Sequence, residues 1–185
     1  MNYRYQFWQP IETDITPKGT KAPYYGSIGV AAFMGDIVND APRIANIPLP
    51  SVHESAYAAY VDNALARIMV LNLLEYNATD YNNYTNDYPR PIEHYQFQLP
   101  QDYAGMEVGV QRLTANGSDA ISGLTFDGWS YNWELDEGRP VRLDNVTYGE
   151  SVSVGHDGKV KVDVPRSSAV ILRFDGGDDA EGDYD

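Results

Sequence analysis

Aromatic side chains gather in two short segments and are the residues best suited to hold a ligand. Trp129, Tyr131 and Trp133 are two residues apart, so in a strand all three rings would lie on one face of a sheet. Exposed rings stack on the apolar faces of sugars, and this spacing predicts a saccharide platform. The alternative is packing of the rings against the core or a neighbouring domain. Asp127-Gly128 directly before them is a turn signal, which leaves the strand assignment open.

The second aromatic segment lies at the beginning of the chain, where Tyr3, Tyr5 and Trp8 alternate with Arg4 and other polar residues such as Gln9. Rings that stack on a sugar, with a guanidinium and an amide that bond its hydroxyls or a carboxylate, are typical of a saccharide pocket. The alternative is a loop that these rings anchor to the domain.

The acidic side chains do not predict catalysis. Hydrolysis of a glycoside requires two carboxyl groups about 5–10 Å apart across the sugar, and the sequence pairs no two of its carboxylates. Glu134, Asp136 and Glu137 cluster, but beside Gly138 they are typical of a charged loop.

The sequence also predicts neither a metal site nor a nucleophile for covalent catalysis. His53, His94 and His156 are far apart and lack metal-ligand spacing, so each is interpreted as a loop or packing residue. The chain has no cysteine, which excludes disulfides, cysteine zinc sites and a thiol nucleophile. The glycines form no phosphate-binding loop, and no serine stands in a Gly-x-Ser-x-Gly elbow. We therefore expect no catalytic residue, cofactor or metal.

Four N-glycosylation sequons, which begin at Asn77, Asn83, Asn116 and Asn145, indicate passage through a secretory pathway. Residues 1–10 are polar and aromatic and carry no apolar core of a signal peptide. Sequons without a signal peptide are typical of the C-terminal piece of a longer secreted protein. Expressed as it stands, the chain is expected to stay in the cytoplasm.

The charge of the chain narrows the range of partners. Its formal net charge is −14 and its isoelectric point is about 4.4. Such a surface repels phosphate backbones and anionic lipids, so nucleic acid and membranes are not expected partners. No apolar run approaches the length of a membrane span.

One helix is expected, near the beginning of the chain. Residues 1–23 are broken repeatedly by proline and glycine and are interpreted as an irregular lead-in. Residues 24–35 place apolar side chains near helical spacing, and Gly35 follows as a C-cap.

After residue 40 the pattern is that of β-structure. Residues 66–75 are almost continuously apolar, which is typical of a strand buried on both faces, although the period alone leaves a short helix as an alternative. Asp62-Asn63 before them favours a hairpin, and 151–164 alternate around Asp157-Gly158, which predicts a hairpin with a type I′ turn. The expected strands are 43–49, 55–61, 66–75, 93–99, 106–114, the two arms of 151–164, and 169–174.

About eight short strands separated by turn signals predict a mainly β fold, an antiparallel β-sandwich preceded by one α-helix. Residues 77–91 are interpreted as a long polar loop. Residues 175–185 are rich in aspartate and glycine and are expected to form a disordered acidic tail.

Several segments resemble, in the right order, the C-terminal region of fungal family 79 glycoside hydrolases of the β-glucuronidase type. Residues 3–10 and 22–35 resemble the end of the catalytic barrel in that family. Residues 65–77 are similar to the central strand of its sandwich, and the match continues through 110–115, 128–130 and 151–164.

The resemblance implies a division of the chain into three parts. Residues 1–40 would be the exit of the eighth strand and the eighth helix of a (β/α)₈ barrel, 41–174 the C-terminal β-sandwich, and 175–185 the tail. The barrel of the family hydrolyses β-glucuronides with two glutamates on strands that precede the matched segment. Tyr3, Tyr5 and Trp8 would then lie near the mouth of the sugar pocket. Because most of the barrel and the N-terminal strands of the sandwich are missing here, a helix face and a sheet edge should be exposed.

Three functional hypotheses follow. The chain is a non-catalytic accessory domain that supports a catalytic barrel present in cis or in trans, or it is a free-standing module that binds glucuronic-acid-containing glycans through its aromatic rings. The third is a truncated gene product without activity, which predicts poor solubility.

Overall fold

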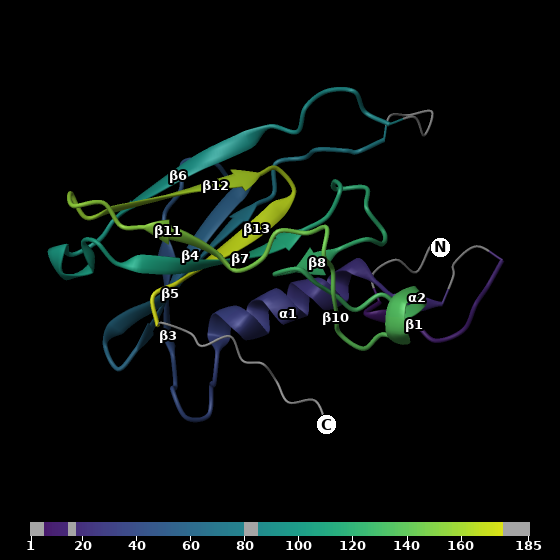
Figure 1. Cartoon of the computed structure of the whole chain (residues 1–185), viewed down its shortest axis with the longest axis horizontal. Coiled ribbons are helices and arrows are strands. Elements are labelled where there is room, and N and C mark those ends of the chain that lie inside the picture. Colours follow the sequence, from purple (N-terminus) through teal and green to yellow (C-terminus); the bar gives the residue numbers. More distant parts are fainter. Residues whose placement is uncertain (1–5, 15–17, 80–84, 176–185) are drawn as a thin grey trace.

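A long antiparallel sheet runs through the molecule and separates two other layers (Figure 1). The structure is a computed structural model that describes residues 6–14, 18–79 and 85–175. The elements are β1 (Trp8–Gln9), β2 (Gly19–Thr20), α1 (Ala22–Met34), β3 (Arg43–Ile47), β4 (Glu54–Val61), β5 (Ala64–Asn72), β6 (Ile92–Gln98), η1 (Gln101–Tyr103), β7 (Glu107–Thr114), β8 (Thr125–Phe126), β9 (Trp129–Ser130), α2 (Trp133–Asp136), β10 (Val141–Arg142), β11 (Glu150–Ser153), β12 (Lys159–Pro165) and β13 (Ser168–Arg173).

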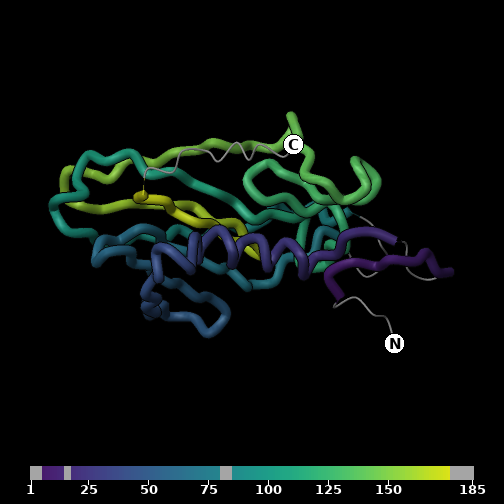
Figure 2. Tube along the Cα trace, turned by 90° about the horizontal axis from the view of Figure 1, so that it is seen from below, coloured from purple at the N-terminus to yellow at the C-terminus, as the bar shows by residue number. Residues whose placement is uncertain are grey.

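The central sheet has the strand order β10-β9-β8-β7-β13-β5-β4-β3, with β11 also paired to β7. A two-stranded sheet of β12 and β6 covers one face of it, and α1 covers the other (Figure 1). Figure 2, seen from below, shows α1 lying along the sheet in front of its strands. The mainly β, antiparallel fold with one preceding helix is therefore confirmed.

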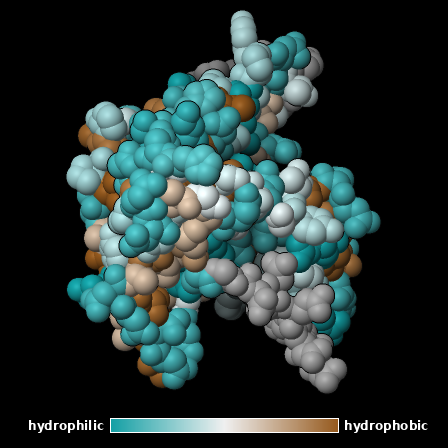
Figure 3. Space-filling view, turned by 60° about the vertical axis from the view of Figure 1, so that its left-hand side comes forward, coloured by the Kyte–Doolittle hydropathy of each residue, from teal (hydrophilic) through white to brown (hydrophobic). Residues whose placement is uncertain are grey.

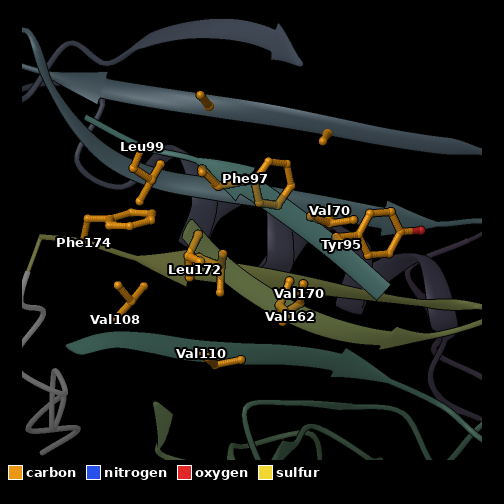
Figure 4. Packing of buried hydrophobic residues seen from close by; sticks show 14 of the residues in the cluster. Val70, Tyr95, Phe97, Leu99, Val108, Val110, Val162, Val170, Leu172 and Phe174 are labelled. Carbon is orange, nitrogen blue, oxygen red and sulfur yellow. The ribbon is translucent and has the colours of Figure 1, made fainter. Parts of the chain in front are cut away.

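The main core fills the space between the two sheets. Val70, Val170 and Leu172 from the centre of the large sheet meet Phe97 of β6 and Val162 of β12, and all five are buried (Figure 4). Alternate residues of β12 face this core, which explains the valine–charge alternation of that strand. Burying these side chains is the main source of stability of the sandwich.

A smaller core lies between the sheet and α1. Phe33 of the helix meets Met69 and Ile171, which point away from the main core. At Gly29, a Cβ would lie at an ordinary contact distance of 3.7 Å from side-chain atoms of Met69 and Leu113, so this side of the helix rests on the sheet. Because β5 is covered on both faces, its apolar run is continuous, as expected for a doubly buried strand.

The β4–β5 hairpin is confirmed in detail. Asp62 and Asn63 have φ of 49° and 68°, the left-handed pair that a type I′ turn requires. Asparagine and aspartate tolerate this conformation better than other non-glycine residues, which is why the dipeptide was informative.

The hairpin predicted over 151–164 is wrong. β11 pairs with β7 of the large sheet, whereas β12 pairs with β6 of the small one. A turn closed by the N–H of Gly158 and the carbonyl of Gly155 (2.8 Å) connects them. It is not type I′, because of its residues only Gly158 has positive φ. The two strands alternate in the same way because both face one core, from opposite layers.

The strand expected to carry Trp129, Tyr131 and Trp133 is also not formed as predicted. β9 ends at Ser130, and Trp133 begins the short helix α2. The three rings therefore do not form one row on a sheet face. Among the described residues, none of the helices is long and apolar enough to cross a membrane. The acidic tail, from residue 176 on, lies outside the described residues.

Candidate functional site

The two aromatic segments of the sequence meet at one end of α1. The short β1–β2 ribbon, the first turn of α1 and the segment around α2 enclose a cavity of about 360 Å³. The lining residues come from both segments and are Trp8, Gln9, Pro10, Lys18, Gly19, Thr20, Tyr24, Trp133, Glu137 and Gly138. This size is within the range of small-molecule pockets.

The walls of this cavity offer rings and charges to a ligand. Trp8 is 58% exposed and Trp133 is 38% exposed, so both retain accessible ring surface. The ammonium group of Lys18 lies 4.9 Å from the centre of the Trp133 ring, a cation–π distance. Glu137 is the one carboxylate among the described lining residues. The set can stack on and hydrogen-bond a polar ring, but it does not contain the two opposed carboxyl groups of a glycosidase.

Tyr24 lines the cavity, and with the buried Tyr25 next to it connects α1 to the segment after β9. Tyr131 packs edge-on against both rings, with centroids 5.7 and 5.8 Å away. The hydroxyl of Tyr25 donates to Oδ1 of Asn132 (3.1 Å) and accepts the backbone N–H of Tyr131 (2.7 Å). Burial raises the pKa of Tyr25 above its ordinary value, so the hydroxyl stays protonated and keeps donating.

Of the aromatic residues predicted to bind sugar, some belong to this cavity and others do not. Trp8 and Trp133 line the cavity and Tyr131 supports it, whereas Trp129 lies elsewhere, with the guanidinium of Arg142 4.3 Å above its ring. Tyr3 and Tyr5 lie outside the described residues. Sugar binding by any of these residues stays a prediction.

Sequence reasoning missed Lys18, Tyr24 and Glu137 as lining residues. Tyr24 is adjacent to Pro23 at the first turn of α1, where a helix start projects its side chains beside the entering chain. Its position at the start of the predicted helix was the signal by which Tyr24 could have been identified as a lining residue. No local signal joined Lys18 and Glu137, which are far apart in sequence.

The histidines and the asparagines of the three described sequons are not among the lining residues of this cavity. His94 pairs with Asp163 across β6 and β12 at 2.6 Å on the exposed side of the small sheet. Asn116 and Asn145 are exposed and Asn77 is half-buried; Asn83 lies outside the described residues. Within the described part of the chain, no cluster of three or more acidic, histidine or cysteine side chains is placed to hold a metal.

A second, larger groove runs beside the outer face of α1. It has a volume of about 840 Å³ and is lined almost entirely by apolar atoms. Its lining residues are Pro23, Gly26, Ser27, Val30, Ala31, Phe33, Met34, Gly35, Ile37, Ile44, Tyr57, Met69, Leu71 and Leu113. The face of the molecule in Figure 3 is mostly hydrophilic, with smaller hydrophobic patches between the polar residues. An apolar groove of this size is typical of a surface that another body covers.

Known proteins share both the sequence and the fold. Residues 56–171 match the C-terminal beta domain of glycosyl hydrolase family 79. A β-glucuronidase of Aspergillus niger is 53% identical over 175 residues, which are 92% of this chain and 32% of that protein. A β-glucuronidase of Neurospora crassa is 43% identical over 203 residues, with 94% of this chain and 36% of that protein covered.

Among solved structures, a 4-O-α-L-rhamnosyl-β-D-glucuronidase from Fusarium oxysporum superposes with a TM-score of 0.65 at 21% identity. The superposition covers 84% of this chain and 30% of that one, and at this identity it shows a shared fold. The chain spans about a third of the length of the curated relatives it matches. It belongs to glycoside hydrolase family 79 and corresponds to the C-terminal β domain of that family.

Proposed function

We propose that this chain is a non-catalytic accessory domain of a β-glucuronidase-like enzyme, which packs on a catalytic (β/α)₈ barrel and stabilises it. The observation that carries the proposal is the composition of α1. None of its thirteen residues is charged. Its inner face packs on the sheet through Tyr25, Gly29 and Phe33, and its outer side still carries Val30 at 55% exposure. A helix that is apolar all round is normally buried all round.

The groove beside α1 supports the same partner. Ile37 and Ile44 extend the apolar surface beyond the helix, and both are exposed. Water contact with this much apolar area is unfavourable by about 25 cal/mol for each Å². Since the chain spans about a third of its relatives, the remaining two thirds supply enough protein to cover the groove.

A third opening lies where the small sheet ends. Among the described strands, β6 pairs with β12 alone, and a groove of about 490 Å³ lined in part by β6 reaches the main core. Ala58, Ile68 and Phe97 are among its lining residues. The two strands of the small layer cover only part of the large sheet, which supports an origin of further strands in the rest of a longer protein.

A binding experiment tests the docking surface. The portion of the Aspergillus niger relative that precedes the matched region would be purified and titrated with this chain by calorimetry. We expect saturable binding that Val30→Asp weakens at least about tenfold, because a buried carboxylate without a partner is costly. Val52→Asp is the matched control, since Val52 is 92% exposed and outside the groove. Equal affinities for the two variants would exclude α1 as the docking face.

The same proposal concerns localisation. As part of a full-length family protein, the domain is proposed to be extracellular, in agreement with its four sequons. Secretion of the full-length protein by a fungal host, followed by detection of the domain in the medium, tests this. Retention of the protein inside the cells would contradict it.

The second candidate function is a carbohydrate-binding module, favoured by the meeting of Trp8 and Trp133 in one cavity beside Lys18. Lys18 would attract a carboxylate while the rings stack on the sugar. Affinity electrophoresis in gels that contain a glucuronic-acid polysaccharide tests it. We expect retardation that Trp133→Ala removes and Tyr148→Ala, an exposed ring outside the cavity, leaves unchanged. Unretarded wild-type protein would count against this candidate.

A further inference from the structure

Two of the sequons, at Asn77 and Asn116, lie on segments that are hydrogen-bonded to each other in the folded chain. The segments 76–79 and 116–119 lie side by side: the N–H of Ser118 donates to the carbonyl of Tyr76 (2.7 Å), and the N–H of Tyr76 donates to the hydroxyl of Ser118 (3.2 Å). A Cβ on Gly117 would lie 2.6 Å from the Tyr76 carbonyl oxygen. Gly117, the second residue of the Asn116 sequon, therefore packs directly against the backbone of Tyr76, and a side chain at this position would clash with it.

The hydroxyls of these two sequons lie on the surface, and both are engaged in hydrogen bonds to other side chains. Thr79 donates its hydroxyl to Asp119 (2.5 Å), which also accepts the N–H groups of Ala78 (2.8 Å) and Thr79 (3.0 Å). The hydroxyl of Ser118 is bonded to that of Ser167 at 2.5 Å. A glycosyltransferase that reads Asn-x-Ser/Thr must reach both the amide and the hydroxyl of an extended segment. Neither hydroxyl is available without local opening.

The third described sequon has a different environment. Asn145 and Thr147 lie exposed on the loop between β10 and β11. Thr79, Asn116 and Ser118 are exposed as well, so the difference between the sequons lies in their hydrogen bonds. The backbone there makes a single long turn contact, from the N–H of Val146 to the carbonyl of Leu143 (3.4 Å). In the described part of the chain, no hydrogen bond occupies the side chains of Asn145 or Thr147. This segment can adopt an extended shape at little cost.

We propose that Asn145 is a glycosylation site that stays open in the folded domain, whereas Asn77 and Asn116 accept a glycan only before 76–79 meets 116–119. The co-substrate is an oligosaccharide linked to a lipid pyrophosphate. The amide nitrogen of the asparagine forms a bond to C1 of the first sugar, the C1–O bond to the pyrophosphate breaks, and the amide proton leaves with it. The domain then has two classes of site. Asn77 and Asn116 accept a glycan only on the nascent chain, whereas Asn145 also accepts one on the folded domain.

In-vitro transfer to unglycosylated protein tests this directly. The full chain, produced in bacteria with Asn83→Gln so that the three described sequons alone remain, is incubated with purified oligosaccharyltransferase and a lipid-linked oligosaccharide. Intact mass counts the glycans and peptide mapping places them. We expect the folded protein to carry one glycan, at Asn145. The folded Asn145→Gln variant should carry none. Transfer to Asn77 and Asn116 should be on the order of a hundredfold slower, because several hydrogen bonds must open first.

Two further samples separate accessibility from intrinsic reactivity. Peptides that contain each sequon should all be glycosylated at similar rates. Asp119→Ala, checked for an intact unfolding transition, frees the Thr79 hydroxyl and should raise transfer to Asn77 in the folded protein. Modification of Asn77 or Asn116 in the folded wild type as fast as Asn145, or no modification of folded Asn145 when its peptide is glycosylated, would overturn the proposal.

Discussion

Substituting Gly35 by alanine tests how α1 is held on the sheet, on which the proposed docking depends. Gly35 ends the helix with φ 64° and ψ −150°, a region that is open to almost no residue but glycine. Forcing alanine into it costs about 1–3 kcal/mol. The new Cβ would also lie 2.5 Å from Nη1 of Arg67.

Arg67 cannot easily move away from that methyl group. Its side chain is buried, at 6% exposure, and Nη2 is paired with Asp175 at 2.5 Å. Nη1 donates to the carbonyl of Phe33 at 3.3 Å, at the C-terminal end of α1. Overpacking against such a fixed group costs a further 1–3 kcal/mol, roughly. We therefore expect Gly35→Ala to lose about 4 kcal/mol, which lowers the melting temperature by roughly 8–16 °C in a chain of this size.

Thermal and urea unfolding of the isolated chain measure this loss. Gly105→Ala is the control, because Gly105 also has positive φ (81°) but no described heavy atom lies within 4 Å of its Cβ. It should cost about 1–2 kcal/mol. In an Arg67→Ala background, Gly35→Ala should lose about 1–3 kcal/mol less than in the wild type. Additive losses, or equal losses at Gly35 and Gly105, would refute the contact between Arg67 and the end of α1.

Three other expectations concern the core, the hydroxyl of Tyr25 and the small sheet. Leu172→Ala removes a fully buried side chain between the sheets and should cost about 3 kcal/mol, against less than about 0.5 kcal/mol for the exposed Leu135→Ala, as measured by urea unfolding. Tyr25→Phe leaves a backbone N–H and a side-chain oxygen without their partner and should cost about 1–3 kcal/mol by the same measurement. The hydrogen bond and then the charge of Asp163 raise the pKa of His94 above its ordinary 6.5. A raised pKa stabilises the folded chain below the unfolded-state value, and that contribution is lost as the pH rises through the folded-state pKa. As the pH rises through the folded-state pKa of His94, the melting temperature of the wild type should therefore fall, and that of His94→Gln should fall less. Identical pH dependences of the two melting temperatures would exclude the ion pair between His94 and Asp163.

Local signals in the sequence were sufficient for part of the fold. Asp62-Asn63 predicted the β4–β5 hairpin because few residues tolerate two consecutive left-handed conformations. Gly35 marked the end of the helix for a similar reason. The unbroken apolar run of β5 indicated a strand covered on both faces, and the structure has α1 on one and β6 and β12 on the other.

The errors arose where the partner of a strand is far away in sequence. Alternation over 151–164 is the same for a hairpin and for two strands that face one core from different sheets, so the pattern could not assign the pairing. Likewise, the two-residue spacing of Trp129, Tyr131 and Trp133 has a common face only within a strand, and the strand ends at Ser130. The position of Trp8 and Trp133 in the lining of one cavity is a tertiary arrangement that no local pattern predicts.

We propose that this domain supports catalysis without performing it. The most direct test is release of the aryl group from an aryl β-glucuronide by three samples: the chain alone, the portion of the Aspergillus niger relative that precedes the matched region alone, and their mixture. We expect no turnover above the blank from the chain, and higher or longer-lasting activity from the mixture than from the preceding portion of the relative. Turnover by the chain alone, or a mixture no more active or stable than the preceding portion of the relative, would exclude a non-catalytic supporting role for this domain.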